Sequence, residues 1–272
     1  MKELQEADRV SAMASQRSRV QCGASMSEPQ VVAIMLTKDR PQMAARAVRA
    51  FREQTYKNKR LLVFDTGQRD QPSPPDEGIS YWHRPEWIGT TPTIGALRNV
   101  ANGLTKADII VTWDSDDVSH PNRIAEQVAH LQSSGADVVG YSELLFWREG
   151  KAQPHLDLSS ANNGEAWLYK APHGTAPGTS LCYKRSTWER KPFSDLPRII
   201  AGKNVGDSED VAWLRGLNLA TVPSLYPNAL CEPRLIASIH GGNTMPYDDL
   251  ESSTSWRRTP QFDSFCRERM VL

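Results

Sequence analysis

From residue 31 onward, short apolar runs alternate with stretches in which apolar side chains recur at helical spacing. The runs are continuous, as is typical of strands that are buried on both faces of a sheet. Strands are predicted at residues 31–36, 61–64, 79–83, 108–113 and 137–141. Helices are predicted to begin at Pro41, at Thr91–Pro92 and at Pro121, because proline suits the first turn of a helix. This succession predicts an α/β fold, with helices on both faces of a mostly parallel, twisted, Rossmann-like sheet.

The second half of the chain is less regular. Residues 151–178 contain glycine, proline and asparagine and predict a long connection. A strand at 179–184, a helix at 207–217, a short strand at 220–223 and a helical segment from Asp248 onward are expected to follow. Residues 1–28 are polar and lack sustained periodicity, which favours a flexible extension. We therefore expect one domain at 29–246, with a helical tail at 247–272.

Composition and charge do not alter the predicted fold, but they argue against several classes of protein. The 272 residues are 39% hydrophobic and 24% charged, which is ordinary for a globular protein. The longest apolar run is far shorter than the ~20 residues of a membrane-spanning helix, and the N-terminus has no apolar segment of signal-peptide length. We expect no integral membrane segment and a cytoplasmic location, where the four separated cysteines would be free thiols. The 32 basic and 32 acidic side chains balance, which disfavours a nucleic-acid partner but leaves one open.

Acidic residues follow several of the predicted strands. These residues are Asp39, Asp65, Asp114, Asp116 and Asp117. Ligands of parallel sheets bind beyond the carboxyl ends of the strands, so we expect these side chains to share one rim. The segment 114–117 holds three carboxylates, which repel one another unless a cation or hydrogen-bond donors neutralise them. Their oxygens suit Mg²⁺ or Mn²⁺, and the alternative is an acidic turn that caps the next helix.

Several short segments occur in a characteristic order. They are Thr37–Pro41, Gln54–Tyr56, Leu62–Asp65, Gly95–Asn99, Asp114–Asp117, Ser208–Asp210 and His240–Asn243. Their order and spacing resemble those of family 2 glycosyltransferases of the GT-A fold. The resemblance covers about residues 30–245. It implies a GT-A domain that takes a nucleotide-sugar donor and passes the sugar to a glycan or another hydroxyl acceptor.

The resemblance also implies roles for individual residues. Asp116 and His240, with Asp114 close by, would form the site of a divalent cation, Mn²⁺ or Mg²⁺. Asp210 would be the catalytic base of an inverting transfer, and Glu209 would help hold the acceptor or the donor sugar. The donor would contact Thr37, Asp39, Asp65, Thr66, Gly95, Arg98, Asp114 and Ser115. Lys38 and Thr66 depart from the family pattern, which leaves UDP, GDP and dTDP open as the nucleotide.

The chemistry of such a transfer needs these residue types. The leaving diphosphate gains charge that a cation can neutralise, and the acceptor hydroxyl must lose a proton to a carboxylate. Indole rings stack on sugars, so Trp167 and Trp213 are candidate acceptor contacts. The structural alternatives are that Asp210 caps a helix and that His240 is an ordinary hydrogen-bonding histidine.

Two other functions stay open from the sequence. A nucleotidyltransferase that makes sugar nucleotides would use a similar sheet and acidic site, but Leu36–Arg40 lacks the glycines of its phosphate loop. A degenerate GT-A domain would bind a sugar nucleotide or glycan without turnover. The acids at 114, 116, 209 and 210 are intact, which favours an enzyme.

Overall fold

The computed structural model describes ten stretches of the chain. They are residues 28–68, 77–87, 92–150, 164–195, 199–200, 203–204, 208–223, 232–240, 250–251 and 253–270. Of the expected N-terminal extension only Glu28 is described, so the expectation for 1–28 lies outside these stretches. None of the helices within the described residues is both long enough and apolar enough to cross a membrane.

Strands and helices alternate through the first half of the chain, as the sequence predicts. The strands are β1 (Val31–Thr37), β2 (Lys59–Asp65), β3 (Ile79–His83), β4 (Ile109–Thr112), β5 (Val118–Ser119), β6 (Val138–Arg148), β7 (Glu165–Lys170), β8 (Cys182–Lys184), β9 (Ile199–Ile200), β10 (Lys203–Asn204), β11 (Leu219–Pro223), β12 (Leu235–Ile239) and β13 (Trp256–Arg258). The helices are α2 (Pro41–Arg52), α3 (Ile94–Gly103), α4 (Arg123–Ser134), α5 (Arg185–Arg190), α6 (Glu209–Leu214) and α7 (Asp263–Met270). Single 3-10 turns lie at Pro85–Trp87, Gly178–Ser180 and Pro260–Phe262.

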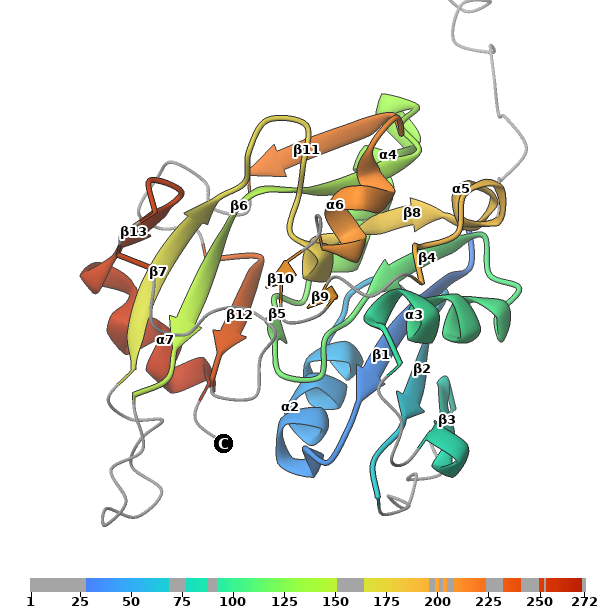
Figure 1. The fold of residues 1–272 in the computed structure, drawn as a ribbon, viewed down its shortest axis with the longest axis horizontal. Helices are drawn as coiled ribbons and strands as arrows, with labels where there is room; N and C mark the ends of the chain where they lie inside the picture. Colours follow the sequence, from blue (N-terminus) through green and yellow to red (C-terminus); the bar gives the residue numbers. More distant parts are fainter. Residues whose placement is uncertain are drawn as a thin grey trace, which may run out of the picture.

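The first half of the sheet is parallel. Its strands lie in the order β3-β2-β1-β4, and each pairs in parallel with its neighbour. The register sets Thr37 opposite Asp65, so β1 and β2 end at the same rim. The sheet then continues through antiparallel β8 to β6, β7 and β13, which makes the whole a mixed, curled sheet (Figure 1).

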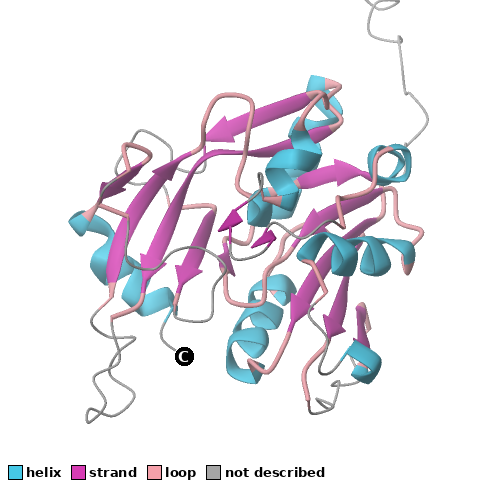
Figure 2. Cartoon of the chain, in the orientation of Figure 1, coloured by secondary structure: helices cyan, strands magenta, loops and turns pink. Residues whose placement is uncertain are grey.

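Helices cover both faces of the parallel half. Alternate residues of β1 face opposite sides: Ala33 packs in one cluster with the apolar side chains of α2 and α4, and Ile34 packs in another with those of α3 and α6. Figure 2 shows the resulting helix–sheet–helix layering in the lower half of the molecule. This is the expected α/β arrangement, and it places the strands between two layers of helices.

β6 connects the two halves of the sheet. Its first residues pair with β8 and β11, and its later residues pair with β7 and β12. The strand is eleven residues long and passes well beyond the predicted end at Tyr141. Two further expectations are corrected here: the connection 151–178 contains β7, and the C-terminal tail adds the strand β13 to the sheet before α7 begins.

Several boundaries differ from the prediction. The N-cap of α3 is Thr93, whose Oγ1 accepts a hydrogen bond from the Ala96 N–H at 3.1 Å. The predicted cap, Thr91, lies outside the described residues. α4 begins two residues after Pro121, and α6 is shorter than the predicted helix at 207–217. The strand predicted at 179–184 is shortened to β8 because its first residues belong to the Gly178–Ser180 turn.

Candidate functional site

The carboxyl ends of β1 and β2 form one side of the site. The Thr66 N–H donates to the Thr37 carbonyl at 3.0 Å, and the Gln68 N–H donates to Asp39 Oδ1 at 2.7 Å. Asp39 has a φ of +52°, a left-handed conformation that is uncommon for residues other than glycine. The strained backbone turns the Asp39 side chain toward the loop after β2, so the two strand ends are joined.

Gly67 allows this junction to be tight. A Cβ on Gly67 would lie 2.9 Å from Asp39 Oδ1 and from Asp65 Oδ1, closer than real Cβ contacts. Asp65 is only 2% exposed, accepts from the Gly67 N–H at 2.7 Å and also accepts from the Tyr81 hydroxyl. Asp39 and Asp65 therefore share one rim, as predicted, and Thr37 and Thr66 lie beside them.

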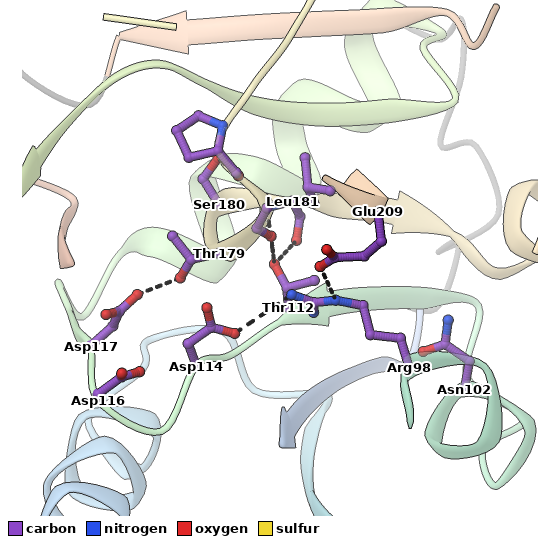
Figure 3. A network of polar contacts seen from close by, with 12 residues as sticks. Arg98, Asn102, Thr112, Asp114, Asp116, Asp117, Thr179, Ser180, Leu181 and Glu209 are labelled. Atoms are coloured by element: carbon purple, nitrogen blue, oxygen red, sulfur yellow. Dashed lines mark hydrogen bonds and ion pairs between the residues drawn. The ribbon is translucent and has the colours of Figure 1, made fainter. Parts of the chain in front are cut away.

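The acidic segment follows β4, on the same side of the sheet. Figure 3 shows Asp114, Asp116 and Asp117 along this loop, with dashed contacts that join Asp117 to Thr179 and Asp114 to Arg98. Asp117 accepts from the Thr179 hydroxyl and, at 3.0 Å, from the Ser238 N–H. Burial and the neighbouring carboxylates raise the pKa of Asp117 well above its usual value. Asp117 thus ties the loop to the turn at 178–180 and to β12.

One carboxylate oxygen of Asp116 contacts both a guanidinium and an imidazole. Its Oδ2 lies 2.8 Å from an Arg40 guanidinium nitrogen and 3.0 Å from His240 Nε2. Burial would raise the pKa of Asp116, but the contact with His240 and the charge of Arg40 outweigh burial and lower it. The Asp116 carboxylate is therefore charged, and an imidazole nitrogen and a guanidinium meet at it.

The backbone of Asp116 is fixed from the opposite side. The buried Arg46 guanidinium of α2 donates to the Asp116 carbonyl at 2.6 Å and also donates to the Met270 carbonyl at the end of α7. Burial is the main reason why the pKa of Arg46 is lowered, although Asp117 and Asp116 act against it. One guanidinium thus links the acidic loop to α2 and to the C-terminal helix.

Arg98 brings the two acidic motifs together. Its guanidinium lies 3.9 Å from Asp114 and 3.6 Å from Glu209 of α6, as Figure 3 shows, and its side chain is 7% exposed. Burial raises the pKa of both carboxyls, and Arg98 offsets part of that rise. Burial would lower the pKa of Arg98, but Asp114 and Glu209 raise it above its usual value. Segments distant in sequence therefore meet at one buried cation.

Asp210 lies beside Glu209 in the first turn of α6. Its Oδ1 accepts from the Val211 N–H at 2.9 Å. A Cβ on Gly178 would lie 2.6 Å from Asp210 Oδ2, so the Asp210 carboxylate sits directly against the Gly178 backbone. The field of Asp210 also acts on Arg98. The structure therefore brings Asp114, Glu209 and Asp210 into one neighbourhood.

Comparison with known proteins decides the family. The sequence profile of glycosyl transferase family 2 matches residues 32–186, more than half of the chain. The chain belongs to glycosyl transferase family 2. No curated protein sequence matches it.

Solved structures agree with this assignment at the level of the fold. A mannosyltransferase from Pyrobaculum calidifontis, in complex with GDP-Man and Mn²⁺, is 14% identical, with a TM-score of 0.51 over 90% of this chain and 70% of that chain. TarS 1–349 from S. aureus, in complex with UDP-GlcNAc, is 11% identical, with a TM-score of 0.49 over 79% of this chain and 60% of that chain. A further TarS structure is covered over 37% of its length, so this family 2 chain spans about two to three fifths of the TarS structures. The likeness to the mannosyltransferase shows the GT-A fold.

The expected cation ligands have different partners in the structure. No cluster of three histidine, cysteine, aspartate or glutamate residues that could hold a metal ion occurs among the described residues. Asp116 and His240 meet, but Asp114 faces Arg98 instead. The three-residue cation site stays a prediction, and the structure brings two of its members, Asp116 and His240, into contact. This pair offers one oxygen and one nitrogen, a donor set that would suit Mn²⁺.

Other expected site residues have structural contacts. The space beside Gly95 is occupied by the backbone of Ser194, because a Cβ on Gly95 would lie 1.8 Å from the Ser194 carbonyl oxygen. Ser115 is buried. Trp213 is 1% exposed and packs among Phe193 and Tyr183, and Trp167 of β7 is 6% exposed. The expectation that these two indoles stack on the acceptor is therefore wrong: both belong to the hydrophobic core.

Four residues of the site were not assigned from the sequence. They are Arg40, Arg46, Gly178 and Thr179. Arg40 lies within the segment Thr37–Pro41 that carries the family resemblance, which was a usable signal. The others act through tertiary contacts, and neither periodicity nor motif spacing reveals those.

Proposed function

We propose that this family 2 protein transfers a sugar from a nucleoside diphosphate to an acceptor hydroxyl, with Asp210 as the base. The observation that supports this most is the position of Arg98 between Asp114 and Glu209, because it brings the acidic loop and the Glu-Asp pair to one site. A glycan acceptor and a cytoplasmic location are the expectations that accompany the proposal. A single base on one side of the sugar implies inversion at the anomeric carbon.

Asp116 and His240 are the residues that would hold a divalent cation. When bound, such a cation supplies positive charge that stabilises the leaving diphosphate. The protein supplies the rest of the arrangement. Arg46 fixes the backbone of Asp116, and Asp117 fixes the loop through Thr179, so the carboxylate needs little reorganisation when the donor arrives.

The rim at the ends of β1 and β2 is the proposed nucleoside site. Thr37, Asp39 and Thr66 lie there on a backbone that is held by hydrogen bonds. Asp39 is exposed, so its free oxygen can accept from a base or ribose. The mannosyltransferase described above is in complex with GDP-Man and Mn²⁺. GDP-mannose with Mn²⁺ is therefore the first donor to test, beside UDP sugars.

Asp210 is proposed to accept the proton of the attacking hydroxyl. Glu209 is engaged by Arg98, whereas Asp210 lies beside the Gly178 backbone and is half-buried. A positioned carboxylate base contributes about 10²–10⁴-fold to such a step. Asp210→Asn should therefore lower kcat by about 10²-fold or more and leave donor affinity unchanged.

The test combines turnover and binding measurements. Release of nucleoside diphosphate from GDP-mannose and UDP sugars is followed with Mn²⁺ or Mg²⁺, and donor affinity is measured by calorimetry. Asp195→Asn is the matched control, because it makes the same change at an exposed position. Near-normal turnover of Asp210→Asn would refute the base assignment. Exchange of pyrophosphate into the donor would favour the nucleotidyltransferase instead, and donor binding without release would favour the non-catalytic alternative.

A further inference from the structure

Arg40 occupies a distinctive position at the edge of the site. It lies between the end of β1 and the start of α2, and its guanidinium reaches Asp116 Oδ2 at 2.8 Å. The Arg40 side chain is 28% exposed, whereas Asp116 is 9% exposed. The cation therefore extends from the molecular surface to a nearly buried carboxylate, on a long stem that has several rotatable bonds.

The same carboxylate oxygen is needed by two different cations. Asp116 Oδ2 is the atom that contacts His240, the other member of the proposed cation pair. A divalent ion on this oxygen would lie next to the Arg40 guanidinium, and two cations on one oxygen repel each other strongly when they are partly desolvated. The Arg40–Asp116 pair and a bound divalent ion are therefore mutually unfavourable.

The surroundings of Arg40 offer a second partner for the guanidinium. Helix α2 starts at Pro41 without a side-chain cap and without an acidic residue in its first turn, so its free N–H groups give this place a positive potential. A guanidinium presents a planar fork that matches phosphate oxygens. A donor diphosphate brought to the Asp116–His240 pair would come within reach of Arg40.

We propose that, in the protein without a divalent cation, the Arg40 guanidinium occupies the position that the cation would take beside Asp116. When the cation binds, Arg40 moves to the donor diphosphate. This inference rests on the proposed function and assigns a residue to the diphosphate of the donor. Arg40 thereby couples two ligands: it opposes the cation when the cation binds alone, and it favours the cation and diphosphate when they bind together.

The test measures two affinities by calorimetry, with no turnover required. The probes are MnCl₂ alone, and then GDP or UDP at saturating Mn²⁺. Arg40→Gln should bind Mn²⁺ alone about threefold to tenfold more tightly, since a part-buried ion pair no longer competes. It should bind the nucleoside diphosphate about tenfold more weakly, since a charge-assisted contact is lost. Arg40→Lys keeps the charge and should retain the weak Mn²⁺ affinity of the wild type.

Arg49→Gln is the matched control, because Arg49 is an exposed arginine in the last turn of the same helix. Neither of its affinities should change. If Arg40→Gln binds Mn²⁺ no more tightly than the wild type, or binds the diphosphate equally well, the inference is overturned while the proposed function stands. If the wild type binds neither Mn²⁺ nor nucleotide, the proposed function fails and this inference fails with it.

Discussion

The contact between Gly178 and Asp210 gives a direct test of how the base is positioned. The perturbation is Gly178→Ala, which adds one methyl group. The Gly178 backbone lies outside the left-handed region, so alanine can adopt its conformation. The turn is also held in place, because the Thr112 hydroxyl donates to the Gly178 carbonyl at 2.7 Å and the Thr179 carbonyl accepts from Arg123 at 2.7 Å. The added methyl group must therefore displace the Asp210 side chain rather than the turn.

The size of the displacement follows from the distances. The new Cβ would lie 2.6 Å from Asp210 Oδ2 and 3.0 Å from its Cβ and Cγ, whereas ordinary contacts begin at 3.4 Å. The carboxylate must retreat by about 0.8 Å, the difference between the first and last of these values. A misplacement of about 1 Å costs about 10²-fold in rate, which corresponds to about 2.7 kcal/mol in the barrier.

The assay is steady-state sugar transfer, together with calorimetric donor binding. Gly178→Ala should lower kcat by about 10²-fold and leave donor affinity within a factor of two or so of the wild type. Gly103→Ala is the matched control, since a Cβ there meets only Trp188, at 4.0 Å, and its kcat should not change. Unchanged kcat in Gly178→Ala, with Asp210→Asn inactive, would show that the Asp210 position does not depend on this glycine.

Two further predictions concern contacts at the two ends of α7. Arg46→Met removes the hydrogen bonds to the Asp116 and Met270 carbonyls. The free energy of unfolding, measured in urea, should fall by about 2 kcal/mol, and Mn²⁺-dependent donor affinity should fall with it. Unchanged donor affinity would refute the link to the acidic loop. Burial would raise the pKa of Asp263, but hydrogen bonds from Arg258 and the Ala166 N–H lower it. The charged Asp263 therefore stabilises the folded protein fully above its unfolded-state pKa, and this stabilisation is lost as the pH falls through the folded-state pKa. Asp263→Asn should therefore cost about 1 kcal/mol at neutral pH, and its difference from the wild type should shrink below about pH 4; a difference that is constant with pH would contradict this reasoning.

The parallel half of the fold could be predicted because its signals are local. Continuous apolar runs mark β1, β2 and β4, and prolines mark the helix starts, so connection rules alone place the strand ends on one side. The shared register of Thr37 and Asp65 is the consequence. The acidic rim was therefore predictable from sequence order and topology together.

The second half could not be predicted in the same way because its strands pair across long sequence separations. β7 lies inside a stretch whose flanking glycines and prolines indicate a loop, and it forms only because β6 and β13 provide partners on both sides. Trp167 belongs to that strand, so assigning it to a loop also led to the wrong role for its indole. Trp213 was misassigned for a related reason: nearness to Asp210 in sequence does not show which face of α6 is buried.

The acidic loop shows why three similar carboxylates cannot share one function. Asp117 is held by a hydroxyl and a backbone N–H, and Asp114 faces the buried guanidinium of Arg98. Exchanging either set of partners would leave a buried group unsatisfied, which is costly. Asp116 differs, because its guanidinium partner Arg40 is 28% exposed, whereas Arg98 is 7% exposed. Water can solvate Arg40 when it leaves, so of the three acids Asp116 is the one that can give up its arginine for a divalent ion at the lowest cost.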